Sequence, residues 1–171
     1  MFESAKMGPK VEIRKAAVED AGQIGEVLLE AFSIYEKFYT AEAFAAVTPP
    51  AEEIVRRFDD GPQWVAVKDD EIVGTVSLTT EPEGLYIRSM AVRPSAQGLG
   101  IGHRLLDALN EHASGSGIAR VFLYTTYFVP GAKELYEKHG FKWVRDTTAE
   151  EWYGTPGLEM DKKIDGLRAN L

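Results

Sequence analysis

Glycine residues gather between Gln97 and His103, directly after residues that alternate like a β-strand and directly before a helical pattern. Gly98, Gly100 and Gly102 can adopt backbone angles that other residues avoid, and they let a ligand approach the main chain closely. The start of the following helix adds unpaired N–H groups and the positive end of the helix dipole. Together these features predict a cradle for phosphate groups.

Two common phosphate-binding motifs do not match this loop. A Walker A loop needs Lys-Ser or Lys-Thr after its last glycine, and neither pair is present here. A dinucleotide fingerprint needs glycine at its sixth position, where counting from Gly98 gives His103 and counting from Gly100 gives Leu105. The spacing Gln97-x-x-Gly100-x-Gly102 instead resembles the [QR]-x-x-G-x-[GA] signature with which acyltransferases of the GNAT family hold the pyrophosphate of acetyl-CoA.

Two flanking segments are similar to the same family. Residues 85–94, LYIRSMAVRP, look like its fourth strand with the ending x-V-x-P, and residues 132–141, AKELYEKHGF, match its A-x-x-L-Y-x-x-x-G-F element. The resemblance implies an α/β fold whose central sheet is mixed and mainly antiparallel, with about seven strands and helices on both faces. It also implies that the fourth and fifth strands, here residues 85–92 and 120–125, splay apart to form a cleft for the acyl-CoA.

The resemblance assigns roles to individual residues. Main-chain groups of Met90, Ala91 and Val92 would pair with the pantetheine arm and direct an N–H at the thioester carbonyl, where it stabilises an oxyanion. Tyr136 matches the family phenol that meets the sulfur of CoA and assists the departure of the thiolate. The residues expected to bind the cofactor are Met90, Ala91, Val92, Gln97, Gly98, Leu99, Gly100, Ile101, Gly102 and His103.

A base is also needed, because the acceptor must lose a proton before its nitrogen has a lone pair to attack with. Many relatives place a glutamate on the fourth strand six residues before the valine of x-V-x-P, and Tyr86 stands there in this chain. We expect Glu83, near the start of that strand, to serve as the base, with Tyr86 as a water-positioning alternative. Val129 is a second departure, since many relatives carry an asparagine there that contacts the cofactor arm.

Aromatic residues mark the expected acceptor pocket. In the family, the segment between the first two helices lines this pocket, so Phe32, Tyr35 and Tyr39 are candidates for substrate binding, with packing in the core or in a lid as the alternative. Trp152 and Tyr153 lie in a polar loop between the last two expected strands. They either close the same pocket or pack on its rim.

The elements that must position these residues follow from periodicity and turn signals. Consecutive strands and strand-helix-strand crossovers alternate along the chain, which predicts an α/β sandwich with a mixed sheet and helices covering both faces. The strands are expected at residues 11–14, 63–68, 71–78, 85–92, 120–125, 141–145 and 158–164, and the helices around residues 24–31, 51–58, 101–113 and 132–139.

Composition narrows the classes of function. A length of 171 residues favours one domain over residues 1–171, with a lead at 1–10 and a tail at 165–171. The net charge of −8 argues against binding to nucleic acid or an anionic membrane, and favours a cationic acceptor.

The chain has no cysteine, and its histidines lack ligand spacing, so we expect neither an enzyme thiol nor a metal site. No segment has the length of a membrane span or the apolar core of a secretion signal, and we expect a cytoplasmic protein.

These observations predict an acetyl-CoA-dependent N-acetyltransferase that transfers the acetyl group directly to the primary amine of a small molecule. Charge and aromatic content favour a small cationic amine. The alternatives are an acetyltransferase for protein N-termini or lysines, and a non-catalytic regulatory module that binds CoA. Sequence leaves both a monomer and a homodimer open.

Overall fold

A central β-sheet organises the protein. The computed structural model describes residues 10–164. The expected tail, and the expected lead except Lys10, lie outside the described residues. Seven strands follow the order β1-β2-β3-β4-β5-β7-β6. All neighbours are antiparallel except β4 and β5, which are parallel. The predicted mixed, mainly antiparallel sheet is confirmed. The strands are β1 (Val11–Lys15), β2 (Gln63–Lys68), β3 (Glu71–Glu81), β4 (Gly84–Val92), β5 (Arg120–Thr125), β6 (Lys142–Asp146) and β7 (Leu158–Lys163).

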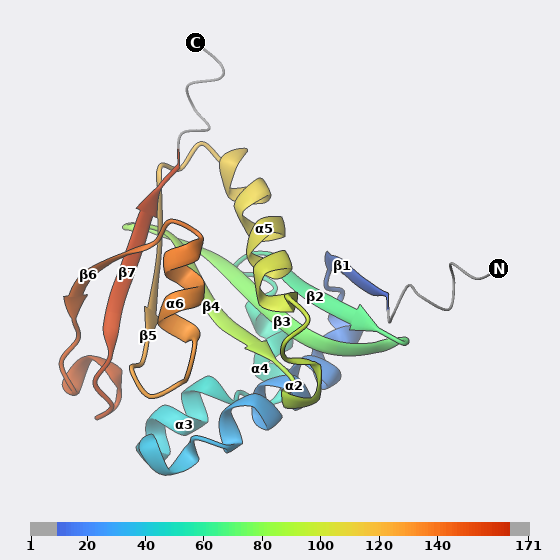
Figure 1. Cartoon of the computed structure of the whole chain (residues 1–171), viewed down its shortest axis with the longest axis horizontal. Helices are drawn as coiled ribbons and strands as arrows, with labels where there is room; N and C mark the ends of the chain where they lie inside the picture. The colour runs from blue at the N-terminus through green and yellow to red at the C-terminus, as the bar shows by residue number, and fades with distance from the viewer. Residues whose placement is uncertain (1–9, 165–171) are drawn as a thin grey trace.

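Helices cover both faces of this sheet, as predicted (Figure 1). Successive side chains of a strand point to opposite faces, so on β2 Trp64 packs with α5 while Val65 packs with α2. Residues of α6 join the α5 side, and α4 joins the α2 side. The helices are α2 (Ala21–Ser33), α3 (Ala41–Val47), α4 (Ala51–Arg57), α5 (Ile101–Ser114) and α6 (Ala132–Lys138).

Two elements differ from the expected ones. β3 continues past Leu78 to Glu81, because Thr79 and Thr80 still pair with β4. The aromatic stretch before Pro49 contains α3, which apolar periodicity does not predict. Thr40 begins this helix with a side-chain cap, since its hydroxyl accepts a hydrogen bond from the Ala43 N–H at 3.1 Å.

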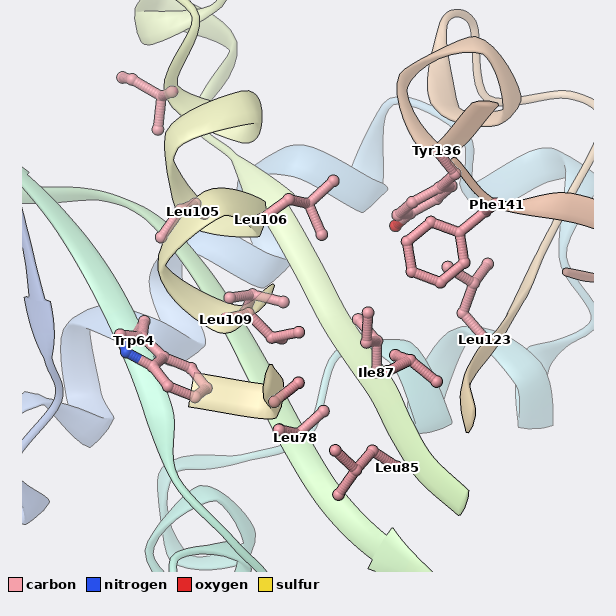
Figure 2. Packing of buried hydrophobic residues seen from close by; sticks show 14 of the residues in the cluster. Trp64, Leu78, Leu85, Ile87, Leu105, Leu106, Leu109, Leu123, Tyr136 and Phe141 are labelled. Carbon is pink, nitrogen blue, oxygen red and sulfur yellow. The ribbon is translucent and has the colours of Figure 1, made fainter. Parts of the chain in front are cut away.

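The larger core lies between α5 and the sheet and fixes where α5 begins. Leu105 and Leu109 are fully buried and meet Trp64 and Leu78 in one cluster (Figure 2). Burying each leucine side chain contributes about 1.5–3 kcal/mol to folding. Ile101, the first residue of α5, belongs to the same cluster and is 2% exposed. The core therefore anchors the end of the glycine-rich loop.

The sheet opens between β4 and β5, as the resemblance implies. Their pairing ends with Ile87 opposite Leu123. Just beyond this point Ser89 has a left-handed φ of 57°, and the register of β4 with β3 shifts there. Such a bulge bends a strand and changes the direction of its side chains. The predicted splay of the two strands is confirmed, and it places a cleft beside the bulge.

Candidate active site

The glycine-rich loop joins the end of β4 to the start of α5. Gly98 and Gly100 have φ angles of 85° and 74°, in the left-handed region that favours glycine. A Cβ atom placed on either residue would meet no other protein atom within 4 Å. The main chain is thus open on this side, next to the free N–H groups of the helix start. This geometry fits a phosphate group, and it agrees with the cradle predicted from the sequence.

Gly102 has a different backbone conformation from the one expected. It lies inside α5, where no left-handed φ is needed. A Cβ atom here would lie 3.2 Å from Leu135 Cδ2 and 3.3 Å from Met90 Cε. The absence of a side chain therefore lets α5 approach α6 and β4 closely. The unusual backbone angle expected at this position is therefore not found, whereas the Gly102 N–H, in the first turn of α5, stays a predicted phosphate donor.

The other loop residues divide between core and surface. The Ile101 side chain is buried, so only its main chain can face a ligand, whereas the Leu99 side chain is 49% exposed. Gln97 is exposed, and its Nε2 donates a long hydrogen bond of 3.5 Å to the Val92 carbonyl. That contact ties the first residue of the motif to the end of β4.

Two basic side chains follow the loop, those of His103 and Arg104, but both make contacts within the protein. Arg104 donates to the Val11 carbonyl at 2.7 Å and so lies toward β1. His103 Nδ1 lies 2.8 Å from His139 Nε2, and the two rings stack. Burial lowers the pKa of His139. Main-chain N–H groups, rather than side-chain cations, are therefore the donors that the loop offers.

A cavity of about 390 Å³ fills the opening between β4 and β5. The cavity draws on three parts of the chain: the α2–α4 segment, the two splayed strands with α6, and the loop between β6 and β7. Its lining includes Phe32, Tyr39, Arg57, Tyr86, Ile87, Arg88, Ser89, Met90, Tyr124, Thr125, Thr126, Val129, Ala132, Tyr136, Glu151, Trp152, Tyr153 and Thr155.

Most of the residues singled out for acceptor chemistry meet in this cavity. Phe32, Tyr39, Tyr86 and Tyr136 line it together, although they come from separate parts of the chain. Tyr35 is not part of the lining. It stands at the start of the 3-10 helix Glu36–Phe38 and is partly buried.

Glu83 lies outside the cavity. It is an exposed residue in the turn between β3 and β4, at the paired end of the opening. Its carbonyl oxygen accepts a long hydrogen bond of 3.5 Å from Arg120. The carboxylate that does line the cavity is that of Glu151. Arg145 binds it through two hydrogen bonds and lowers its pKa to about 2, so it is a weak base.

The cofactor-binding part of β4 shows three different environments. Met90 lines the cavity, and its side chain also packs against the α5 core. The Ala91 side chain points to the opposite face and packs with α2, whereas Val92 packs against the α5 core. Only main-chain groups of Ala91 and Val92 can therefore serve a ligand in the cleft, which is the role that the resemblance gives them.

Tyr136 projects from α6 into the cavity. Its side chain is 7% exposed and packs against Phe141, and Figure 2 shows the hydroxyl oxygen directed away from α6. Burial raises the pKa of this phenol, with a smaller contribution from the nearby Tyr86. The hydroxyl consequently keeps its proton at neutral pH and can donate it.

Tyr86 forms the floor of the cavity on β4. Its ring stacks on Phe122 with centroids 5.2 Å apart. Burial raises its pKa to about 12, an effect that the positive charge of Arg88 partly offsets. Tyr86 is therefore a neutral hydrogen-bonding group, suited to hold a water molecule and unable to act as a strong base near neutral pH.

Sequence analysis missed Arg57 and Arg88. Arg88 lies two residues after Tyr86 on β4, so strand alternation could have placed both on one face. Arg57 comes from α4, and nothing in its local pattern indicates that it reaches the cavity. Its Nη1 donates to Ser89 Oγ at 3.3 Å, which brings it to the bulge.

The loop between β6 and β7 closes the cavity from a third side. Trp152 and Tyr153 both line the cavity. Thr40 fastens this loop to the start of α3: its hydroxyl donates to the Tyr153 carbonyl at 2.6 Å, and its N–H donates to Thr155 Oγ1 at 3.0 Å. Two segments far apart in sequence are thus bound together over the pocket.

Within residues 10–164, no group of three or more His, Asp or Glu side chains is arranged to hold a metal ion. In the same part of the chain, no helix has the length and apolar character needed to cross a membrane.

Comparison with known proteins identifies the class. Residues 28–141 match the acetyltransferase (GNAT) family. This chain belongs to that family. The chain is 33% identical over 79 residues to an IAA acetyltransferase of Azospirillum brasilense, a match that covers 45% of this chain and 52% of that protein. It is 28% identical over 145 residues to the uncharacterised N-acetyltransferase YhfO of Bacillus subtilis, covering 77% and 90% respectively.

A solved structure supports the fold. The PaiA N-acetyltransferase of Thermoplasma acidophilum, in complex with coenzyme A, superposes with a TM-score of 0.75 at 23% identity, covering 90% of this chain and 99% of that one. Several curated relatives are matched over only part of their length, 52% and 56% for two of them. The family and the fold are established by these comparisons, and the loop geometry fits the acetyl-CoA that this family uses.

Proposed function

We propose that this protein is an acetyl-CoA-dependent N-acetyltransferase that transfers the acetyl group directly to the primary amine of a small molecule. The observation that carries the proposal is the position of the Tyr136 phenol. It is buried and protonated, and it lines a cavity at the opening between β4 and β5. Bound acetyl-CoA supplies the acetyl group as a thioester.

The loop and β4 would hold the cofactor. Main-chain N–H groups around Gly98 and Gly100 bind its pyrophosphate, because the left-handed glycines keep that side of the loop open. Beyond Ile87, the β4 main chain has no β5 partner. Its polar groups over residues 90–92 are therefore available to the amide-bearing arm, as the resemblance implies.

Tyr136 would donate a hydrogen bond or a proton to the leaving thiolate. A thiol has a pKa of about 8.5 and a phenol about 10, so the transfer is close in energy before burial raises the phenol further. A group that stays neutral and holds its proton also avoids repelling the thiolate. Tyr136 is therefore the catalytic residue in this proposal.

Removal of the amine proton is assigned to water held by Tyr86. Glu83 is outside the cavity, and the paired Glu151 is a poor base. Tyr86 faces the cavity with its proton in place, so it can orient a water molecule toward the amine. Glu83 as the general base is the less favoured alternative.

The size of the cavity supports a small molecule, rather than a protein, as the acceptor. A volume of about 390 Å³ lies in the range of small-ligand pockets, about 300–1,000 Å³. The loop that Thr40 fastens over the opening narrows access for a polypeptide. The cytoplasmic location and the homodimer considered from the sequence stay predictions.

A thiol-release assay tests the proposed function. The protein is mixed with acetyl-CoA and either small primary amines or peptides with free N-termini and lysines, and free CoA is measured. Release with small amines is expected. Release with peptides alone would favour a protein acetyltransferase, and CoA binding by calorimetry without turnover on any amine would favour a regulatory module.

A further inference from the structure

We propose that the acceptor amine carries a carboxylate group, which Arg57 and Arg88 bind inside the cavity. This inference deepens the proposed function and rests on it. Amino acids and their longer homologues are the class of substrate that it names. The carboxylate would lie on the α4 side of β4, so that the two arginines orient the amine toward the cleft.

The two arginines reach one place from different elements. Arg57 comes from α4 and Arg88 from β4, and both line the cavity that contains Tyr86 and Tyr136. Their side chains are only 13% and 23% exposed. The hydrogen bond from Arg57 to Ser89 Oγ fixes its guanidinium beside the bulge. A guanidinium offers planar, paired donors that suit a carboxylate.

The charges around these arginines do not cancel. Among residues 10–164, Arg56, Arg57 and Arg88 form ion pairs with two carboxylates, those of Glu53 and Asp60. The exposed Asp59 also acts on Arg56, on the solvent side of the cluster. Glu53 is shared between Arg56 and Arg57, and Asp60 between Arg56 and Arg88. This cluster of five side chains, the arginine cluster, therefore carries one unmatched positive charge. An anionic ligand would neutralise it.

One buried donor in the cluster also lacks a partner. Arg88 Nε is buried without a hydrogen bond among the described residues. Such a group costs about 1–3 kcal/mol when it stays unsatisfied, and more when it is charged. Burial and the neighbouring Arg88 both lower the pKa of Arg57, as expected for two cations held close together with too little compensation. A carboxylate between the two guanidinium groups would reduce the repulsion between these cations.

Among the described residues, the cavity has no free carboxylate that could bind a purely cationic amine. Glu151 is the carboxylate in the lining, and Arg145 already binds both of its oxygens. The net charge of −8 led us to expect a cationic acceptor, but that charge is spread over the whole surface. Interactions inside a pocket depend on the nearest charges, because distant ones are screened by salt. The charges that line the cavity therefore favour an amine that also carries a negatively charged group.

Matched amines test the proposal. The panel pairs L-alanine, L-phenylalanine, β-alanine, 4-aminobutanoate and 4-aminobenzoate with their carboxamides and with the amines that lack the carboxylate. CoA release is measured for each at several pH values, since the carboxylate also alters the amine pKa. We expect at least one amino acid to exceed both of its partners in kcat/KM by about tenfold or more.

Three variants locate the effect. Arg88→Gln and Arg57→Gln should raise KM for the preferred amino acid about tenfold to a hundredfold, and should raise KM for its uncharged partner much less. Arg88→Lys should restore part of the affinity, since it returns the charge without the planar donors. Arg56→Gln is the matched comparison, because Arg56 is 56% exposed in the same ion-pair network and does not line the cavity. It removes the same charge without removing a group that can touch the ligand, so it should raise KM for the amino acid clearly less than Arg88→Gln does.

The outcomes separate the two proposals. Equal or better turnover of the uncharged amines, or an equal loss in Arg56→Gln and Arg88→Gln, overturns the carboxylate site and leaves the acetyltransferase standing. No CoA release with any amine of the panel, despite CoA binding, overturns the proposed function and this inference with it. Melting temperatures of the variants show whether a loss of affinity is merely a loss of folding.

Discussion

The ring of Tyr136 meets the ring of Phe141 edge to face, with centroids 5.9 Å apart and planes inclined at 74°. Phe141 is 2% exposed and belongs to the core between the sheet and α5. Its N–H also donates to the Tyr136 carbonyl at 3.1 Å. The core thus fixes both the main chain and the ring of the proposed catalytic residue, and leaves the hydroxyl at the cavity.

Tyr136→Phe should separate chemistry from packing. The new ring keeps the contact with Phe141, so the free energy of unfolding should change by less than about 1 kcal/mol. Without the phenolic proton, kcat should fall about tenfold to a hundredfold, while the Kd for acetyl-CoA stays within about twofold. Thiol release and calorimetry measure the two effects. Unchanged turnover would remove Tyr136 from the mechanism.

Gly98→Ala and Gly100→Ala should weaken binding of CoA. Each added Cβ points into the open side of the loop, and each strains a left-handed residue by about 1–2 kcal/mol. We expect the Kd for CoA, measured by calorimetry, to rise about tenfold or more because the methyl group occupies the phosphate site.

The matched control for these variants is Gly140→Ala. Gly140 has a similar φ of 89°, and its added Cβ would lie 3.8 Å from Lys162 Cδ, in ordinary contact. This variant should lose similar stability in urea denaturation and keep its affinity for CoA. An equal loss of affinity in all three variants would mean that strain, not the site, causes the effect.

Thr40→Val should loosen the loop between β6 and β7. The substitution keeps the shape of the side chain but removes the hydroxyl that caps α3 and donates to the Tyr153 carbonyl. Loss of the cap should lower the free energy of unfolding by about 1–2 kcal/mol. Hydrogen exchange at residues 150–155 should become faster, and KM for the acceptor should rise more than KM for acetyl-CoA.

Thr48→Val serves as the comparison, because its hydroxyl donates to Phe44 within the same segment and does not contact the loop. It should leave exchange at residues 150–155 unchanged. If both variants accelerate exchange there, Thr40 is not the fastening point.

Asp20→Asn should change how stability depends on pH. Arg14 donates to both oxygens of Asp20, at 2.8 and 3.1 Å, and the Ala17 N–H donates at 2.7 Å. The hydrogen bonds from Arg14 lower the pKa of Asp20. A lowered pKa in the folded state adds stability that is present above the unfolded pKa of about 3.9 and is lost as pH falls through the folded value.

The variant should therefore be less stable than the parent by about 1–2 kcal/mol at pH 7, and this difference should shrink as the pH falls below about 4. Urea denaturation at a series of pH values measures it. Asp59→Asn, at an exposed position, should show no such difference. A gap for Asp20→Asn that stays constant down to pH 2 would contradict the assigned cause.

Much of the fold follows from patterns that sequence displays directly. The apolar run at residues 64–67 before the turn at Asp69-Asp70 predicts a buried strand, and both faces of β2 do meet helices. Motifs with fixed spacing predict the glycine-rich loop and the position of Tyr136. These predictions succeed because the local backbone geometry depends on only a few consecutive residues.

The remaining features depend on contacts between distant segments. The place of Arg57 depends on how α4 packs beside β4, and the place of Glu83 on where the hairpin turn falls. Gly102 looked like a loop residue because its partners, Leu135 and Met90, come from two other elements. No local spacing encodes such relations, so sequence could indicate the kind of site and only part of its walls.

The pairing of β4 with β5 spans fewer residues than any other neighbouring pair in the sheet, from Leu85 opposite Val121 to Ile87 opposite Leu123. The backbone ladder therefore contributes least where the two halves of the domain join, and side-chain packing must hold the angle between them. A substitution in that packing can alter the reach between cofactor and acceptor while every ligand contact stays intact. Variants far from the cleft can for this reason change the spacing of the reacting groups.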